Sequence, residues 1–212
     1  IQLPGWGMDF SLGTKILWQN FDGPNYLIVE KTWYNIEAIK TKFSSPLPAE
    51  YYPAHFPMYP AIVSGFDQLM KGPTAMLLST LLGSVLCFLM FFRYLKEFKL
   101  SKNALWLCLV FLVLPARWVA IRAIGSPEPW FLFFIIASIY YFRKEKFWMA
   151  GLFGALAQLT KSSAVLLLGA YGLFALIESV KHKKIQFKYL PLLIQALAVV
   201  GLFWFFGVRT GD

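Results

Sequence analysis

The sequence changes near residue 72 from a mixed polar and apolar pattern to long apolar runs. Residues 1–72 contain acids, bases, prolines and glycines interspersed with apolar residues. After residue 72, uncharged apolar stretches alternate with short bursts of lysine and arginine. A bilayer-spanning helix needs about 20 mostly apolar residues, and helices packed in a bundle can be shorter. The pattern predicts an all-α integral membrane protein, with an N-terminal extracytoplasmic head at 1–72 that contains short membrane-surface helices and a multi-span bundle at 73–212.

Six apolar segments are predicted to cross the membrane. They cover residues 73–92, 104–121, 129–142, 147–159, 164–177 and 189–208. The connections between them are too short to be anything but turns at the membrane face. In the fourth segment, small residues at positions 150, 151, 154, 155 and 157 predict close packing against neighbouring helices, because small side chains let backbones approach each other in lipid.

The distribution of basic residues predicts the orientation of these segments. Cytoplasmic loops are enriched in lysine and arginine. Alternate connections hold eleven of them, against four at the intervening ends. The eleven are Arg93, Lys96, Lys99, Lys102, Arg143, Lys144, Lys146, Lys181, Lys183, Lys184 and Lys188, and the four are Arg117, Arg122, Lys161 and Arg209. The head is therefore expected outside the cytoplasm, on the plasma (inner) membrane in a prokaryote, with an earlier helix of a longer protein bringing the chain across.

Composition excludes several functional classes. Hydrophobic residues make up 58% of the chain and charged residues 15%, against roughly 45 to 50% and about 25% in soluble domains. The net charge of +9 is distributed in short bursts between apolar runs, which argues against a nucleic-acid partner. Cys87 and Cys108 lie inside apolar runs, so both are interpreted as small hydrophobic residues and not as disulfide or metal-binding cysteines.

The predicted topology places five ionisable residues at the outer face. They are Asp22 in the head, Glu128 at the mouth of the third span, Lys161 at the turn after the fourth, and Arg117 and Arg122 near the end of the second. Ionisable groups at membrane depth or at the rim of a bundle are costly, which makes them candidates for function.

Each candidate also has a purely structural interpretation. Asp22 precedes Pro24 as an N-cap residue precedes a proline in the first helical turn. Glu128 could begin its helix favourably against the helix dipole, and Lys161 could extend its ammonium group from the helix end into water. The two arginines could serve topology or ion pairing, and His55 could be an ordinary hydrogen-bonded loop residue.

The head also contains a stretch rich in proline and aromatic residues, at 51–60. Closely spaced prolines favour extended backbone before them. The sequence therefore predicts a non-helical aromatic loop here.

Four motifs resemble a known family. The run F-D-G-P-N-Y at 21–26, followed by H-F-P-M-Y-P at 55–60, resembles the W-D-G-x-x-Y and F-F-P-L-Y-P pattern of membrane glycosyltransferases of the GT-C superfamily. Within it, the mannosyltransferases similar to the second mannosyltransferase of glycosylphosphatidylinositol-anchor synthesis, with their bacterial and archaeal relatives, are the nearest in pattern. G-S-P-E-P-W-F-L at 125–132 and A-Q-L-T-K at 157–161 resemble the Y-S-E-x-x-F and A-x-L-T-R elements of that group. The resemblance covers residues 18 to 178.

The chain departs from the family pattern at several positions. Phe21 stands where the family has tryptophan and Lys161 where it has arginine, while Gly125 and Pro127 alter the element that holds Glu128. The head contains no Asp-x-Asp or Glu-x-Asp pair, so no metal ligand is assigned and a divalent cation stays an open question.

The resemblance implies transfer of a hexose, mannose or another, from a polyprenyl-phosphate carrier to a hydroxyl of a glycan, lipid or protein on the outer face, with inversion. Asp22 is the candidate general base. Lys161, supported by Arg117 and Arg122, is the candidate ligand of the donor phosphate. Glu128 is a supporting acid that orients Lys161, hydrogen-bonds the sugar or positions Asp22. The predicted sugar pocket consists of Tyr26, Tyr51, Tyr52, His55 and Tyr59.

Two other classes of function stay open. A transporter or lipid flippase would use the outer charges to gate a path, although transporters place their sites near the bilayer midplane and these spans are nearly free of charge. A non-catalytic scaffold subunit of a membrane complex is the other alternative.

Overall fold

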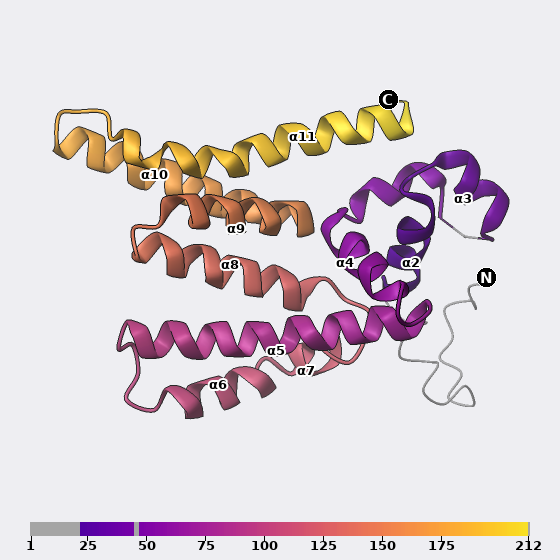
Figure 1. Cartoon of the computed structure of the whole chain (residues 1–212), viewed down its shortest axis with the longest axis horizontal. Coiled ribbons are helices and arrows are strands. Elements are labelled where there is room, and N and C mark those ends of the chain that lie inside the picture. The colour runs from indigo at the N-terminus through magenta and orange to yellow at the C-terminus, as the bar shows by residue number, and fades with distance from the viewer. Residues whose placement is uncertain (1–21, 45–46, 212) are drawn as a thin grey trace.

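The structure is a computed structural model that describes residues 22–44 and 47–211. In chain order, with η marking 3-10 helices, the elements are α2 Gly23–Thr32, α3 Ile36–Lys42, η2 Ala49–Ala54, α4 Met58–Asp67, α5 Pro73–Glu97, α6 Ala104–Val113, α7 Ala116–Ile121, α8 Glu128–Arg143, α9 Phe147–Thr160, η3 Ser162–Ala164, α10 Val165–Lys181, η4 Phe187–Leu192 and α11 Leu193–Thr210. Long helices lie side by side in a bundle, and the short helices α2 to α4 cover one end of it (Figure 1).

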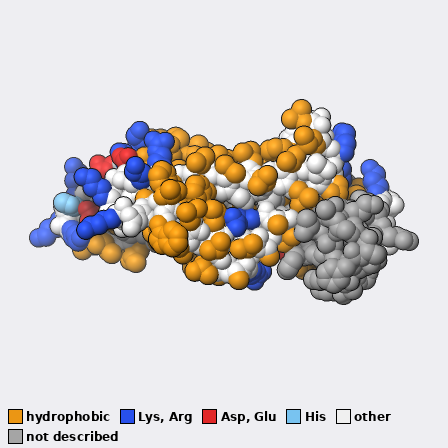
Figure 2. All heavy atoms as spheres, turned by 90° about the horizontal axis from the view of Figure 1, so that it is seen from below, with side chains coloured by type: hydrophobic (Ala, Val, Ile, Leu, Met, Phe, Trp, Pro, Cys, Tyr) orange, Lys and Arg blue, Asp and Glu red, His pale blue; other side chains and the backbone are white. Residues whose placement is uncertain are grey.

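Helices in the bundle have the length and composition of membrane spans. Within residues 22–44 and 47–211, three segments are long and apolar enough to cross a membrane: Pro73–Glu97, Ser162–Lys181 and Phe187–Thr210. Ala104–Val113 and Phe147–Thr160 are shorter apolar helices. Large apolar side chains cover much of the flank of the bundle, and most lysine and arginine side chains lie toward its ends, with a small basic group on the flank (Figure 2). The chain is therefore an all-α protein with the features of a membrane protein, as the sequence predicted.

The second predicted span, 104–121, is not a single helix. Helix α6 ends at Val113, and α7 begins at Ala116. Between them Leu114 is extended, with φ −122° and ψ 136°, because the ring of Pro115 disfavours a helical conformation in the residue before it. The prediction of one continuous helix here was wrong.

The basic connections gather at one end of the bundle. The turns after α5, α8 and α10 lie at the end away from the head (Figure 1). Contacts tie two of these turns together: Lys144 forms an ion pair with Glu97, and the Arg143 guanidinium lies 3.9 Å from the ring centroid of Phe98. The basic turns that alternate along the sequence thus lie together at one end of the bundle (Figure 1).

The aromatic stretch at 51–60 is more helical than predicted. Its first part lies in η2, and Pro60 lies in the first turn of α4. The first N–H groups of a helix have no partner within the helix, so a proline in this turn sacrifices no backbone hydrogen bond. The prediction of a non-helical loop was wrong for both parts, whereas the predicted short helices in the head are present.

The head and the bundle share one hydrophobic core. The Tyr26 and Tyr59 rings meet edge to face with centroids 5.0 Å apart. The Tyr59 hydroxyl lies 2.6 Å from Thr80 Oγ1 on α5. Buried residues of both parts make up this core: Tyr26, Leu27, Tyr59, Val63, Ala75, Met76, Trp130, Phe134, Ala157 and Ala164. The short helices of the head thus pack against the ends of α5, α8 and α9.

Helix α9 lies at the centre of the bundle, and its small residues permit this. The five predicted positions are all buried, at Ala150, Gly151, Gly154, Ala155 and Ala157. A methyl group on Gly151 would overlap the backbone carbonyl oxygen of Pro191. The predicted role in close helix packing is confirmed.

This packing gives a first testable prediction. Gly151→Ala should destabilise the protein by about 1 to 3 kcal/mol, the usual cost of overpacking, because the Pro191 backbone cannot rotate away. The matched control is Gly169→Ala on α10, where a methyl group meets nothing within 4 Å. Apparent melting temperatures in detergent should fall for Gly151→Ala only, and an equal fall in both variants would contradict the packing argument.

Candidate active site

A cavity of about 170 Å³ lies where the head meets the ends of α8 and α9. Its lining comes from the start of α2, the end of η2, the start of α8 and the turn after α9. The lining residues are Asp22, Tyr26, Tyr51, Ala54, His55, Pro127, Glu128, Thr160, Lys161 and Ser162. Three candidates far apart in the sequence, Asp22, Glu128 and Lys161, therefore border one space.

Asp22 occupies the N-cap position of α2 without acting as a cap. Its side chain makes no hydrogen bond to the first turn of the helix. The carboxylate Oδ1 instead lies 3.7 Å from His55 Nε2. The capping interpretation is therefore wrong, because the carboxylate faces the cavity.

Electrostatics keep this carboxylate ionised. Polar interaction with His55 is the main cause that lowers the pKa of Asp22 below its ordinary value of 3.8. Desolvation opposes this, and the charges of His55 and Lys161 lower the pKa further. Asp22 is consequently a carboxylate at neutral pH, able to accept a proton.

His55 is held firmly beside Asp22. Its side chain is 4% exposed and meets Tyr26 and Tyr51 edge to face, with ring centroids 4.9 and 5.4 Å away. The Tyr34 hydroxyl donates a 2.6 Å hydrogen bond to the His55 backbone carbonyl. Among the described residues, the buried Nδ1 atom has no hydrogen-bond partner. A buried polar atom left unpaired costs about 1 to 3 kcal/mol, so Nδ1 favours contact with water or a hydroxyl of a ligand.

Glu128 and Lys161 form an ion pair at the cavity wall. Lys161 Nζ donates to Glu128 Oε1 at 2.8 Å, and Ser126 Oγ donates to the other carboxylate oxygen. Glu128 begins α8, where the helix dipole also favours a negative charge. Lys161 is fixed by a partner and does not simply extend into water. Of the roles considered for Glu128, orienting Lys161 is the one that matches its contacts.

The two arginines lie elsewhere. Arg117 is exposed on α7. The guanidinium of Arg122 donates to the backbone carbonyls of Trp118 and Leu112. Neither arginine borders the cavity, so the expectation that they support Lys161 was wrong: Arg122 is engaged by local backbone carbonyls, and Arg117 is exposed.

Two of the predicted pocket tyrosines lie behind the cavity. Tyr52 is fully buried in a second hydrophobic cluster with Ile28, Val29 and Ile39, and Tyr59 is fully buried against α5. Only Tyr26, Tyr51 and His55 of the predicted pocket line the cavity. The helical turns of η2 and α4, which the sequence did not indicate, decide which rings face inward.

Sequence reasoning missed several cavity residues. Thr160 and Ser162 line the space, and Ser126 hydrogen-bonds Glu128. Ser126 and Thr160 are letters of the two later family-like motifs, so the motifs themselves carried a signal for them. Ser162 had none.

The described residues also bear on the questions of a metal site and of the two cysteines. Residues 22–44 and 47–211 contain no group of three histidine, cysteine, aspartate or glutamate side chains placed to hold a metal ion. Cys87 and Cys108 are buried, and Cys108 packs in an apolar cluster with Leu95 and Ala104, as expected of small hydrophobic residues.

Comparisons with models of protein families, with curated proteins and with solved structures gave no significant match.

Proposed function

We propose that this chain belongs to a membrane glycosyltransferase of the GT-C type, which transfers a hexose from a polyprenyl-phosphate carrier to an acceptor hydroxyl. The observation that carries the proposal is the convergence of Asp22, Glu128 and Lys161 on one cavity. These residues come from three of the segments that resemble the family motifs. A base and a cation at a shared cavity can each accelerate glycosyl transfer from a phosphate, the base by accepting the acceptor proton and the cation by stabilising the leaving group.

The proposed reaction is a single displacement. The acceptor oxygen forms a bond to the anomeric carbon while the bond from that carbon to the phosphate oxygen breaks, and the bonding electrons leave with the phosphate. Asp22 accepts the proton of the acceptor hydroxyl. A well-placed base of this kind accelerates a reaction by about 10² to 10⁴. One displacement inverts the anomeric centre.

Lys161 is proposed to stabilise the leaving phosphate. Negative charge on the phosphate increases as the glycosidic bond breaks, so a fixed cation stabilises the transition state more than the ground state. Glu128 holds the ammonium group at 2.8 Å, and this leaves Lys161 little freedom to move away. The unpaired Nδ1 of His55 suits a hydroxyl of the sugar or acceptor.

The position of the cavity also favours an enzyme over a transporter. Transporters bind substrate near the bilayer midplane between broken helices. Here the polar residues lie between the helix ends and the head. The volume of about 170 Å³ is below the 300 to 1,000 Å³ of typical ligand pockets, which suits one sugar ring. In this proposal the six apolar segments cross the membrane, with α6 and α7 together as one crossing, and the head faces outward, where carrier lipids supply the sugar.

A transfer assay on membranes tests the proposal. Membranes that contain the full-length protein should transfer label from a radiolabelled polyprenyl-phosphate hexose, and mannose is the first sugar to try. They should not transfer label from a nucleotide sugar. Movement of the intact donor across the bilayer would indicate a flippase, and the absence of both activities would favour a scaffold subunit.

A further inference from the structure

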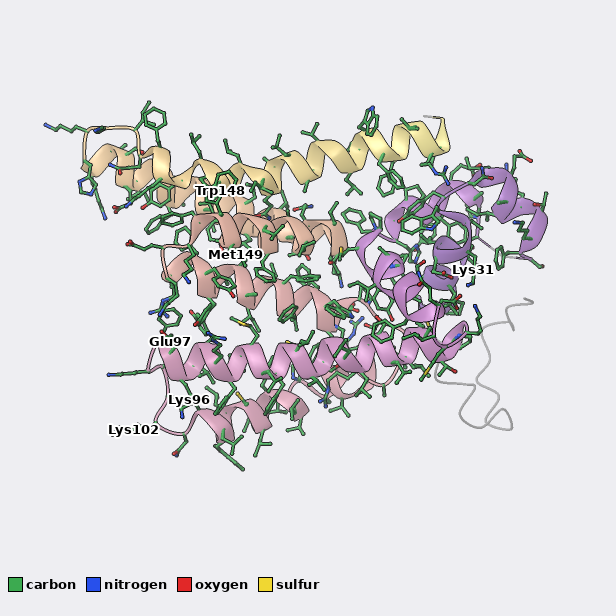
Figure 3. The ribbon with its side chains drawn as sticks, viewed as in Figure 1. Lys31, Lys96, Glu97, Lys102, Trp148 and Met149 are labelled. Carbon is green, nitrogen blue, oxygen red and sulfur yellow. The ribbon has the colours of Figure 1, made fainter. Side chains whose placement is uncertain are left out.

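A groove lies at the opposite end of the bundle from the candidate active site. Its volume is about 660 Å³, and it lies beside the turn that joins α5 to α6. Three lysines and two polar residues line one part of it, and apolar side chains line the rest: Phe92, Lys96, Lys99, Ser101, Lys102, Asn103, Ala104, Leu105, Trp106 and Leu109. Figure 3 places Lys96 and Lys102 around this turn.

The groove is preformed by the packing beneath it. Leu95, Ala104 and Cys108 form a buried cluster that joins α5 to α6. Lys99 adopts a left-handed conformation with φ 51°, which reverses the chain. The Leu100 N–H then donates to the Leu95 carbonyl at 3.0 Å. The three lysines are therefore held around one space by the backbone.

The charge at this groove is one-sided. Within the described residues, no acidic side chain pairs with Lys96, Lys99 or Lys102, and the neighbouring Glu97 pairs with Lys144 instead. Lys96 Nζ lies 5.7 Å from the Phe92 ring centroid, above the apolar wall.

The apolar wall of the groove is exposed. The Trp106 side chain is 66% exposed, and tryptophan is enriched where membrane spans meet water. A positive rim above such a wall complements an anionic lipid, whose charged headgroup would meet the lysines and whose acyl chains would meet the apolar wall.

A second cavity, of about 580 Å³, provides a contrast at the same end of the bundle. It lies around Trp148 and Met149 on α9 (Figure 3) and is also largely apolar. Its charged lining residues are Glu145, Lys146 and Lys188. An acid therefore offsets one of the two lysines there, whereas no described acidic residue lines the first groove beside its three lysines.

From this contrast we infer that the groove between α5 and α6 binds an anionic glycerophospholipid, with the phosphate among Lys96, Lys99 and Lys102 and the acyl chains along Phe92 and Trp106. Each lysine near a membrane surface favours an anionic lipid. The apolar wall gives the acyl chains the kind of apolar contact that they otherwise make with neighbouring lipids. The inference rests on the membrane location and the groove, and it does not depend on the proposed transferase activity.

Lipid titration tests this site. The detergent-solubilised full-length protein is titrated with phosphatidylglycerol or with zwitterionic phosphatidylcholine, and bound lipid is counted by native mass spectrometry. We expect at least tenfold tighter binding of phosphatidylglycerol. The triple variant Lys96→Gln, Lys99→Gln, Lys102→Gln should lose this preference, while replacement of the same lysines by arginine should keep it. Trp106→Ala should weaken binding of both lipids.

The second cavity supplies the matched control. Lys146→Gln with Lys188→Gln removes two positive charges from the same end of the bundle and should leave the preference intact. Equal affinity for both lipids in the wild type, or equal loss in the control and triple variants, would overturn the inference. Glycerol phosphate that binds as tightly as the lipid would also overturn it, by assigning the groove to a soluble phosphate.

Discussion

Replacement of Asp22 by asparagine is expected to lower the rate of sugar transfer by a factor of about 10² to 10⁴, the usual contribution of a general base. Asparagine has nearly the same shape, but its amide cannot accept the proton of the acceptor hydroxyl. The fold should survive the change, because the Asp22 side chain is 67% exposed and makes no capping hydrogen bond. Transfer rates in membranes, normalised to folded protein, measure the effect.

Asp67 in the same head provides the matched control. Its carboxylate accepts hydrogen bonds from Lys31 Nζ at 2.7 Å and from the Gly72 N–H at 2.6 Å, and it does not border the cavity. Asp67→Asn should therefore lower thermal stability and leave the rate per folded molecule unchanged. Full transfer activity in the Asp22→Asn variant would end the catalytic assignment of Asp22.

The pH dependence follows from the lowered pKa of Asp22. The active form of a general base is the ionised one, so activity is present above the pKa and falls as the pH drops through it. Since the pKa lies below 3.8, protonation of Asp22 should remove less than half of the rate between neutral pH and that value. A loss of more than half of the rate within this interval that Asp22→Asn abolishes would contradict the assignment.

The second large effect is expected at Lys161. Lys161→Ala should lower transfer by a factor of about 10² to 10³, the cost of removing one preorganised group that stabilises charge in a transition state. The kinetics with respect to the donor should worsen more than those with respect to the acceptor, because Lys161 is proposed to contact the donor phosphate. Lys161→Arg keeps the charge and should retain much of the activity. Kinetics with each substrate varied in turn separate the two effects.

Lys31 provides a control for loss of an ion pair as such. The Lys31 side chain is 43% exposed and forms a 2.7 Å ion pair with Asp67. The Lys161 side chain is similar, with 42% exposure and a 2.8 Å ion pair with Glu128. Lys31→Ala should affect stability and leave the donor kinetics unchanged. Equal losses in donor and acceptor use for Lys161→Ala would instead assign Lys161 a role in holding the fold.

Much of the helical architecture could be predicted from the sequence. The apolar segments became helices with nearly the expected bounds, because chain in a membrane must satisfy its backbone hydrogen bonds within each segment. The exception, 104–121, contains Pro115, and the conformational restriction before proline ended the helix there. The opposite error was made in the head, where proline was taken to exclude a helix although Pro60 lies in the first turn of one. The first turn of a helix tolerates proline, and a pattern does not show where a turn begins.

The candidate site was predicted only in part. Asp22, Glu128 and Lys161 were expected to lie together at one surface, but the cavity that they border depends on how the head packs against α8 and α9. The partnership of Asp22 with His55 was not foreseen, since these residues are far apart in the sequence. Arg122 was excluded from the site by backbone carbonyls that only the folded chain brings near it.

The sequence by itself determined that this chain is helical and suited to a membrane, and that its basic residues gather on alternate turns, because hydrophobic length and charge are local properties. Only the tertiary structure decided which side chains face each other. Contacts such as the 2.8 Å pair of Glu128 and Lys161 arise between segments brought together by the shared core of head and bundle, and no local pattern contains that distance.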